Sequence, residues 1–348
     1  MTQKLKLGSY PYTYVRVQVM RSKILREQDY AQLLKMSTAE TIRFLSDSEY
    51  RKAVDELGLA FEGVDLLDHV LAKHLSNVFD KIRRISPDDL RTLVEMYLMR
   101  FDNWNVKAML RSKFINLAAD EMKKMLIPCA QYSEAQMLAW YREADVPSLL
   151  IAVPMLAPRA KERALRLFTE TGSLVVLENA LDRQYFRTLR HFSSMVPEEG
   201  ELLREFITLE AYTTNIMTIL RFKREGMPST DIKEYLIPNP QRINEYRAMI
   251  ASEIQDVHKH IRRPRVRRMV EEGMAEFEKT RSLVPLERAI GRYLLMKTQS
   301  ITHRHVMSID IVLSYLFAKE IEVKNLRLIM KGKALGMTES FIQEGLII

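Results

Sequence analysis

The sequence repeats one short pattern at an interval of 110 residues. In each copy an asparagine precedes two basic residues, and the three copies are Asn105 with Arg111 and Lys113, Asn215 with Arg221 and Lys223, and Asn325 with Lys331 and Lys333. The asparagines are evenly spaced (215 − 105 = 325 − 215 = 110). This interval is longer than that of short solenoid repeats, so the pattern predicts a domain-sized unit that is present three times.

A second pattern recurs in phase with the first. It reads leucine, acid, any residue, small or branched apolar residue, large aliphatic residue, any residue, base. Its acids and bases are Asp68 and Lys73, Glu178 and Arg183, and Glu287 and Arg292. The acids are 110 and 109 residues apart (178 − 68 and 287 − 178). Two patterns in constant phase through three copies indicate domain triplication. We therefore expect three helical lobes, over residues 1–100, 101–210 and 211–348.

Composition favours helices throughout. The 348 residues include only 11 Gly and 12 Pro, whereas Leu, Met, Arg, Lys, Glu and Ala, which have high helix propensity, are plentiful. Shorter helices are predicted over residues 29–45, 133–143 and 241–260. No segment shows the alternation of apolar and polar residues that is typical of strands. The predicted fold class is all-α.

Three long helices are predicted near the asparagines. Pro87 is followed by two aspartates, which marks a helix start, because the first turn does not need the missing N–H and carboxylates favour the positive end of a helix. The first long helix is expected over residues 87–113, and its counterparts over 197–224 and 304–333. Helices of this length would connect successive lobes, and the lobe boundaries would fall inside them.

The two ends of the chain carry versions of the same helix. Residues 14–23 resemble the asparagine pattern, and their Arg21-Ser22-Lys23 repeats the Arg-Ser-Lys of residues 111–113. We expect the C-terminal helix of the third lobe to pack beside the first lobe and close the structure.

The motif residues are expected to organise packing. An asparagine amide can form hydrogen bonds to the backbone of a neighbouring helix and so fix how two helices cross. The acid and base of the second pattern are five residues apart and do not face each other on one helix, so ion pairs between repeats are plausible. Direct contact of these residues with a partner protein is the alternative.

Catalytic, cofactor and metal sites are not predicted. Gly332-Lys333 lacks the earlier glycine and the hydroxyl residue of a phosphate-binding loop. The pairs His258/His260 and His303/His305 are two residues apart, which directs the rings away from each other on a helix. The single cysteine, Cys129, has no nearby histidine to act as a base, so a buried apolar thiol is the expected state.

Charge and hydropathy limit the partners. The net charge is +8, which suits an acidic protein surface, anionic lipid or nucleic acid. The densest basic run, residues 262–268, is either a solvated helix start or a patch for a partner, and it lacks the aromatic residues that would stack on RNA bases. The longest apolar stretch, residues 146–158, contains three prolines and is shorter than the roughly 20 residues of a transmembrane span.

The phased patterns resemble the C subunit of archaeal A-type and bacterial V-type rotary ATPases, whose eukaryotic relative is the d subunit of the V-ATPase. The resemblance rests on the opening segment, residues 14–25, and on the two patterns, and it covers essentially the whole chain. In the first repeat Val70 and Lys73 replace the alanine and arginine found elsewhere.

The resemblance implies a funnel of three lobes with approximate threefold symmetry and a central cavity. It implies a non-catalytic subunit on the cytoplasmic side of the membrane, a peripheral protein that joins the membrane ring of ion-carrying subunits to the central stalk during ATP synthesis or hydrolysis. Its partners would be the rotor ring and the stalk, without cofactors or nucleic acid. The alternatives are a basic helical protein that binds nucleic acid, with steep salt dependence, and a helical enzyme with a deep pocket of perturbed carboxylates or histidines.

Overall fold

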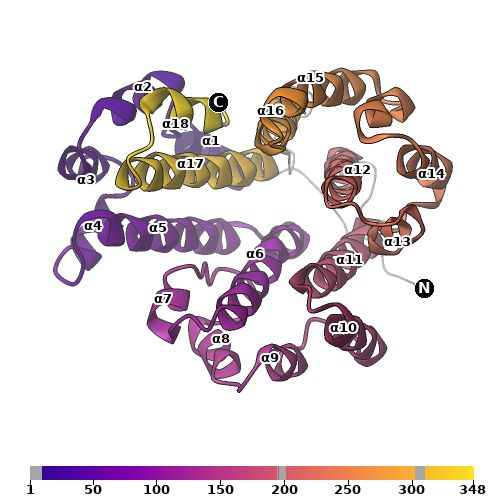
Figure 1. Ribbon diagram of the computed structural model, residues 1–348. Helices are drawn as coiled ribbons and strands as arrows, with labels where there is room; N and C mark the ends of the chain where they lie inside the picture. Colours follow the sequence, from indigo (N-terminus) through magenta and orange to yellow (C-terminus); the bar gives the residue numbers. More distant parts are fainter. Residues whose placement is uncertain (1–9, 194, 196–200, 302–309) are drawn as a thin grey trace. The chain divides into compact units, whose positions relative to one another are not determined.

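The computed structural model describes residues 10–193, 195, 201–301 and 310–348, and these residues contain helices and no strand. The all-α prediction is therefore confirmed. They form two compact units (Figure 1). The middle unit comprises residues 144–294, and the terminal unit comprises 10–143 together with 295–348. The expected division into three lobes at residues 100 and 210 stays a prediction.

The terminal unit contains helices from both ends of the chain. They are α1 (Pro11–Arg21), α2 (Glu27–Lys35), α3 (Thr38–Ser46), α4 (Arg51–Leu57), α5 (Gly63–Ile85), α6 (Asp88–Phe114), α7 (Ala119–Lys123), α8 (Glu134–Tyr141), α17 (Asp310–Ala334) and α18 (Glu339–Gly345). In Figure 1, α17 runs alongside α5, and it also packs against α1, α2 and α6. The last long helix of the sequence therefore lies among the first helices.

The middle unit is a run of consecutive helices. They are α9 (Val146–Ala152), α10 (Pro158–Thr171), α11 (Leu174–Ser193), α12 (Glu201–Arg224), α13 (Ser229–Tyr235), the 3₁₀ helix η2 (Pro240–Arg242), α14 (Ile243–Ala251), η3 (Ile254–His260) and α15 (Pro264–Thr280). The unit boundary falls inside α16 (Val284–Ile301), between Leu294 and Leu295.

The core of the terminal unit lies between α5 and α17. Apolar residues recur on α5 every three or four positions, so that they form one stripe, and Leu67, Leu71 and Leu75 on it are at most 1% exposed. The partner helix α17 is buried around most of its circumference from Asp310 to Phe317. A helix that is buried on all sides belongs to the interior of a domain, so α17 is a structural centre of this unit.

The bounds of the long helices agree closely with the predicted ones where the structure describes them. The first, α6, agrees with the predicted 87–113 within one residue at each end. The predicted starts of the second and third fall at 197 and 304, outside the described residues.

The short helix expected over residues 29–45 is in fact two helices, because Met36 is extended (ψ 144°) and Ser37 caps α3 through a reciprocal capping box with Glu40. The segment 241–260 is likewise broken at Ser252.

Candidate functional site

Each repeated asparagine closes a clamp on an extended backbone segment. Its amide nitrogen donates to the carbonyl, and its amide oxygen accepts from the N–H, of the isoleucine 22 residues later. The pairs are Asn105 with Ile127 (2.8 and 2.8 Å), Asn215 with Ile237 (2.9 and 2.8 Å), and Asn325 with Ile347 (2.7 and 2.9 Å). A side-chain amide carries an N–H donor and a carbonyl acceptor side by side, so it can bind the carbonyl and the N–H of one residue at the same time. One asparagine therefore satisfies both polar groups of a backbone position, which is buried at Ile127 and Ile237 and partly exposed at Ile347.

The clamped segments carry a repeat that the sequence analysis missed. Leu-Ile pairs occur at residues 126–127, 236–237 and 346–347, again 110 apart (236 − 126 = 346 − 236). Each pair follows a short helix, α7, α13 or α18, and Leu126, Leu236 and Leu346 are all buried. The recurrence of this apolar pair could have identified the partner of each asparagine.

The lysine of each copy binds carbonyl groups in the last turn of another helix or just beyond it. Lys113 donates to the carbonyl of Glu143 (2.9 Å), after α8, and Lys223 donates to those of Ile250 (2.7 Å) and Ser252, at the end of α14. Helix C-termini present carbonyls without intrahelical partners, which a cation satisfies well.

The third copy uses a helix from the other end of the chain. Lys333 donates to the carbonyls of Leu33 (2.5 Å) and Met36, at the end of α2. The set α17, α18 and α2 is therefore equivalent to α6, α7 and α8, and to α12, α13 and α14. Gly332 is a buried residue within α17, and a Cβ there would come within 2.6 Å of Ile342 on α18, so close helix packing accounts for this glycine.

Two acids of the second pattern pair with bases of the first pattern from another copy. Glu287 accepts from Arg221 (2.7 Å) in the middle unit. In the terminal unit Asp68 lies 3.3 Å from Lys331 and 3.3 Å from Arg327. The more exposed pairs, Arg221–Glu287 and Lys331–Asp68, contribute little stability each, but they join different copies of the repeat.

Two further motif residues contact neighbours within their own unit. Lys73 lies 3.6 Å from Glu56, and Arg183 donates to the carbonyl of Glu234. Arg111 is exposed on α6, Glu178 is half-buried on α11, and Arg292 is exposed on α16. Arg111 and Glu178 belong to different compact units.

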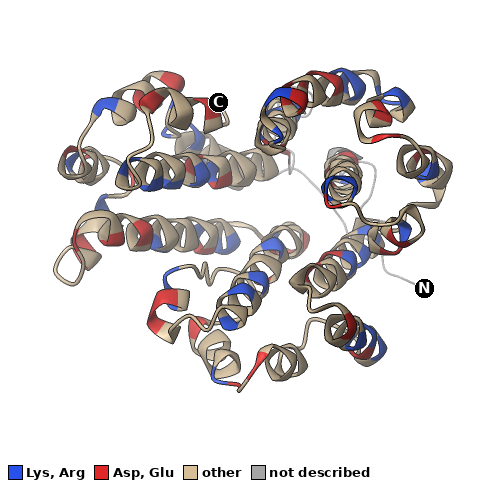
Figure 2. Cartoon of the chain, in the orientation of Figure 1, with Lys and Arg blue, Asp and Glu red and all other residues tan. Residues whose placement is uncertain are grey.

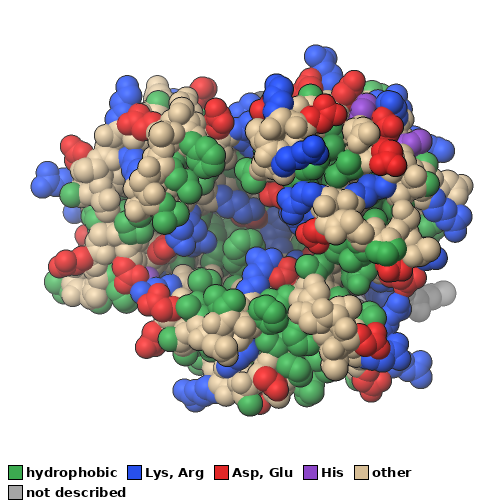
Figure 3. Space-filling model, viewed as in Figure 1, with side chains coloured by type: hydrophobic (Ala, Val, Ile, Leu, Met, Phe, Trp, Pro, Cys, Tyr) green, Lys and Arg blue, Asp and Glu red, His purple; other side chains and the backbone are tan. Residues whose placement is uncertain are grey.

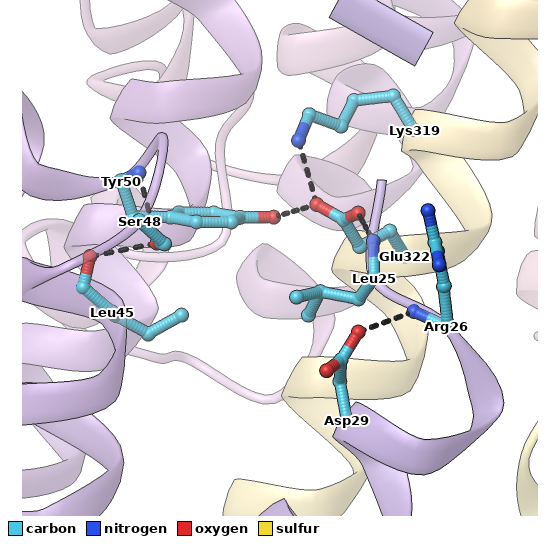
Figure 4. Close-up of polar contacts among 8 residues, drawn as sticks. All are labelled: Leu25, Arg26, Asp29, Leu45, Ser48, Tyr50, Lys319 and Glu322. Atoms are coloured by element: carbon cyan, nitrogen blue, oxygen red, sulfur yellow. Dashed lines mark hydrogen bonds and ion pairs between the residues drawn. The ribbon is translucent and has the colours of Figure 1, made fainter. Parts of the chain in front are cut away.

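A buried ion pair on α17 connects the two ends of the chain (Figure 4). The Glu322 carboxylate accepts hydrogen bonds from Lys319 Nζ (2.6 Å), Tyr50 Oη (2.5 Å) and the Leu25 N–H (2.8 Å). Lys319 is 2% exposed and Glu322 0%. Charges this deep are tolerated only with full pairing, and removal of one partner leaves an uncompensated charge. The network therefore fixes the position of α17 against the segments around Leu25 and Tyr50.

A second carboxylate on α17 binds α6. Glu320 accepts from Tyr97 (3.0 Å), Arg100 (3.0 Å) and Lys324 (2.7 Å). Burial opposes ionisation of Glu320, but the charges of Lys324 and Arg100 lower its pKa to about 2.

A buried histidine lies beside the ion pair. His74 stacks on the Tyr50 ring, with ring centroids 3.9 Å apart. Burial, with the charge of Lys319 second, lowers the pKa of His74 to about 2. At neutral pH this ring is uncharged and serves packing.

Features of a reactive centre are not found in the described part of the chain. No group of three or more His, Cys, Asp or Glu side chains there is placed to hold a metal ion. Cys129 is buried, and burial raises the pKa of its thiol. His258 is hydrogen-bonded to the Gln255 carbonyl, whereas His303 and His305 lie outside the described residues. No described helix is long and apolar enough to cross a membrane.

The basic run, residues 262–268, includes the first residues of α15, and two of its arginines form contacts within the protein. Arg267 donates to the Ile261 carbonyl (2.8 Å), and Arg268 pairs with Glu272 (3.0 Å). Lys and Arg residues are distributed over both units (Figure 2). Charged side chains of both signs cover the face drawn in Figure 3, with hydrophobic side chains between them.

The structure thus defines an all-helical repeat protein whose motif residues bind backbone groups and other repeats. The chain belongs to the family of ATP synthase (C/AC39) subunits, whose model matches residues 13–345. The family is an accessory part of the synthase, without a catalytic role of its own.

Two relatives illustrate the extent of the similarity. The C subunit of the A-type ATP synthase of Haloferax volcanii is 31% identical over 347 residues, which are 98% of this chain and 98% of the relative. The protein of the same name from Methanosarcina barkeri is 29% identical over 343 residues, 98% of this chain and 93% of the relative. The similarity therefore extends over nearly the full length of both chains.

Proposed function

We propose that this chain is the non-catalytic socket of an A-type ATP synthase, joining the central stalk to the membrane ring of ion-carrying subunits. It would act as a peripheral protein on the cytoplasmic side of the membrane and transmit rotation during ATP synthesis or hydrolysis. The observation that carries the proposal is the family match over residues 13–345, since relatives named as the C subunit of A-type ATP synthases align over almost their whole length.

The internal contacts support a mechanical role. A part that transmits torque must resist deformation, and close-packed helices with fixed crossings do so. The three asparagine clamps and the Lys319–Glu322 pair fix helix positions by hydrogen bonds that are buried or, at Asn325, partly buried. Because α17 carries a clamp, a lysine cap and the ion pair together, the end of the chain is fastened to its beginning.

The family match does not favour the nucleic-acid alternative, and the contacts of Arg267 and Arg268 within the protein account for part of the basic run. Measurement of RNA binding tests this alternative directly. Binding of RNA by the full-length chain, with an affinity that falls steeply as salt rises, would favour that alternative.

The proposal is tested by assembly on membranes. Vesicles that contain the ring but lack this chain are mixed with the ATP-hydrolysing head and its central stalk, with or without the purified chain, and sedimented. We expect head and stalk to sediment with the vesicles only when the chain is present. Equal sedimentation without it would contradict the socket role.

A further inference from the structure

The middle unit contains a groove between α10, α11 and α13 that none of the repeated contacts explains. Its volume is ≈ 660 Å³, within the range of ligand-binding clefts. Small or apolar side chains, including Ala160, Ala164 and Ala180, form part of its lining. Because these side chains are small, the backbone of another helix can approach the lining of the groove closely.

Four arginines line this groove in two pairs. Arg159 and Arg163 are one turn apart on α10, and Arg183 and Arg187 are one turn apart on α11. At 1.5 Å rise per residue each pair spans about 6 Å along its helix. The helices are joined by a two-residue turn in which Gly172 takes a left-handed conformation (φ 66°), so they run antiparallel.

The positive charge of the groove is only partly neutralised within the protein. Asp231 and Glu234 are the acids in the lining, and the Glu234 carboxylate pairs with Arg163 (2.6 Å). Among the described residues, neither Arg159 nor Arg187 has a carboxylate within ion-pair distance. Burial, followed by the nearby charge of Arg163, lowers the pKa of Arg183. Like charges held together in this way create a positive potential over the apolar lining.

Arg183 has basic counterparts in the other copies, Lys73 and Arg292, whereas Arg187 does not recur. The position four residues after the base of the second pattern is Asn77 in the first copy, Arg187 in the second and Met296 in the third. The asparagine clamp, by contrast, is present in every copy. The arginine at this position is particular to the middle unit.

We propose that this groove, the α10–α11 groove, binds an acidic amphipathic helix of a partner protein. Carboxylates one turn apart on that helix would face the paired arginines, and small apolar residues on the same face would cover the alanines. Charge complementarity favours this occupant, and the alanines match an apolar helix face better than a hydrated headgroup. The inference does not depend on the socket role, since it concerns a different set of residues.

The test measures binding of a fluorescent peptide of repeated Glu-Ala-Ala-Leu units to the full-length chain by anisotropy. Arg159→Glu/Arg187→Glu reverses two exposed charges, and we expect affinity to fall about tenfold or more. Arg166→Glu/Arg247→Glu is the matched control, because it makes the same charge change at exposed residues outside the groove lining. The control should bind like the wild type.

A second variant separates the shape of the groove from its charge. Ala160→Phe fills the groove without a change of charge and should also weaken the peptide. Circular dichroism confirms that each variant is folded. Equal weakening by the two charge-reversed pairs would overturn the proposal, because it would show attraction by net charge alone. Binding of phosphatidylglycerol vesicles, but not of the peptide, with loss in Arg159→Glu/Arg187→Glu, would also overturn it and assign the groove to lipid.

Discussion

Lys333, in the last turn of α17, donates a hydrogen bond to the backbone carbonyl of Leu33, at the end of α2. The two residues are 300 positions apart in the sequence. Lys113 and Lys223 make equivalent bonds to helices that follow them within 30 residues. The third copy of the repeat is thus completed by the start of the chain.

Removal of one asparagine clamp should destabilise the protein clearly. Asn215→Ala leaves the N–H and carbonyl of Ile237 buried without partners, and unsatisfied buried groups cost about 1–3 kcal/mol each. We expect the free energy of unfolding to fall by about 2–4 kcal/mol in urea denaturation. Asn179→Ala is the control, because Asn179 bonds only the Val175 carbonyl of its own helix and is half-buried. A loss in Asn215→Ala no larger than in this control would refute the role of the clamp.

The buried ion pair should be far more sensitive than an exposed one. Lys319→Met leaves the Glu322 carboxylate buried without a counter-charge, and breaking such a pair costs about 3–5 kcal/mol. Lys331→Met removes a cation that is 50% exposed and 3.3 Å from Asp68, so its loss should stay below about 1 kcal/mol. Chemical denaturation of both variants compares them directly. Similar losses would mean that water reaches Glu322.

Acid should destabilise the protein partly through His74. Its pKa is about 2 in the folded chain and about 6.5 in an unfolded one. Below pH 6.5 the unfolded state therefore binds a proton that the folded state does not, and stability falls as pH falls. The contribution of His74 to the slope of the unfolding free energy against pH approaches about 1.4 kcal/mol per pH unit. Glu320, with a pKa of about 2, adds to the loss below pH 4.5.

The His74→Phe variant isolates that contribution. The phenyl ring can keep the stacking on Tyr50 but takes up no proton. Between pH 6 and pH 5 the unfolding free energy of the variant should depend less on pH than that of the wild type. Parallel pH profiles of the two proteins would show that His74 is protonated in the folded state.

Loss of the end of the chain should loosen its beginning. A chain that ends at Ala318 lacks Glu320 and Glu322 and so removes the partners of Tyr50, the Leu25 N–H and Tyr97. In hydrogen–deuterium exchange we expect amides of α2 and α5 to lose protection. Unchanged protection there would contradict the central place of α17 in the terminal unit.

The periodic features of this protein can be predicted from its sequence, but several of the residues that the motif side chains contact cannot. The phase of the asparagines predicted equivalent helices, and the start of α6 followed from Pro87 and its acids. The partner of Asn105 was expected on a neighbouring helix, whereas it is the extended backbone at Ile127. The break between α2 and α3 was missed, although Ser37 and Glu40 have the spacing of a capping box.

The buried charges were hidden for a different reason. Lys319, Glu320 and Glu322 have the composition of a solvated helix face, and only contacts with Tyr50 and Tyr97, more than 200 residues away in sequence, show that they are buried. The arginines of the α10–α11 groove are ordinary helix residues in the sequence. Their proximity depends on the turn at Gly172, which pattern analysis alone does not orient.

The central claim is tested most directly by the number of ions moved per ATP hydrolysed. Membrane vesicles with the complete synthase and vesicles depleted of this chain are compared for ATP hydrolysis and ion uptake under the same conditions. The proposal predicts that depletion abolishes ion uptake while the head still hydrolyses ATP, and that added wild-type chain restores the ratio. Ion uptake that stays coupled to hydrolysis in depleted vesicles would contradict it.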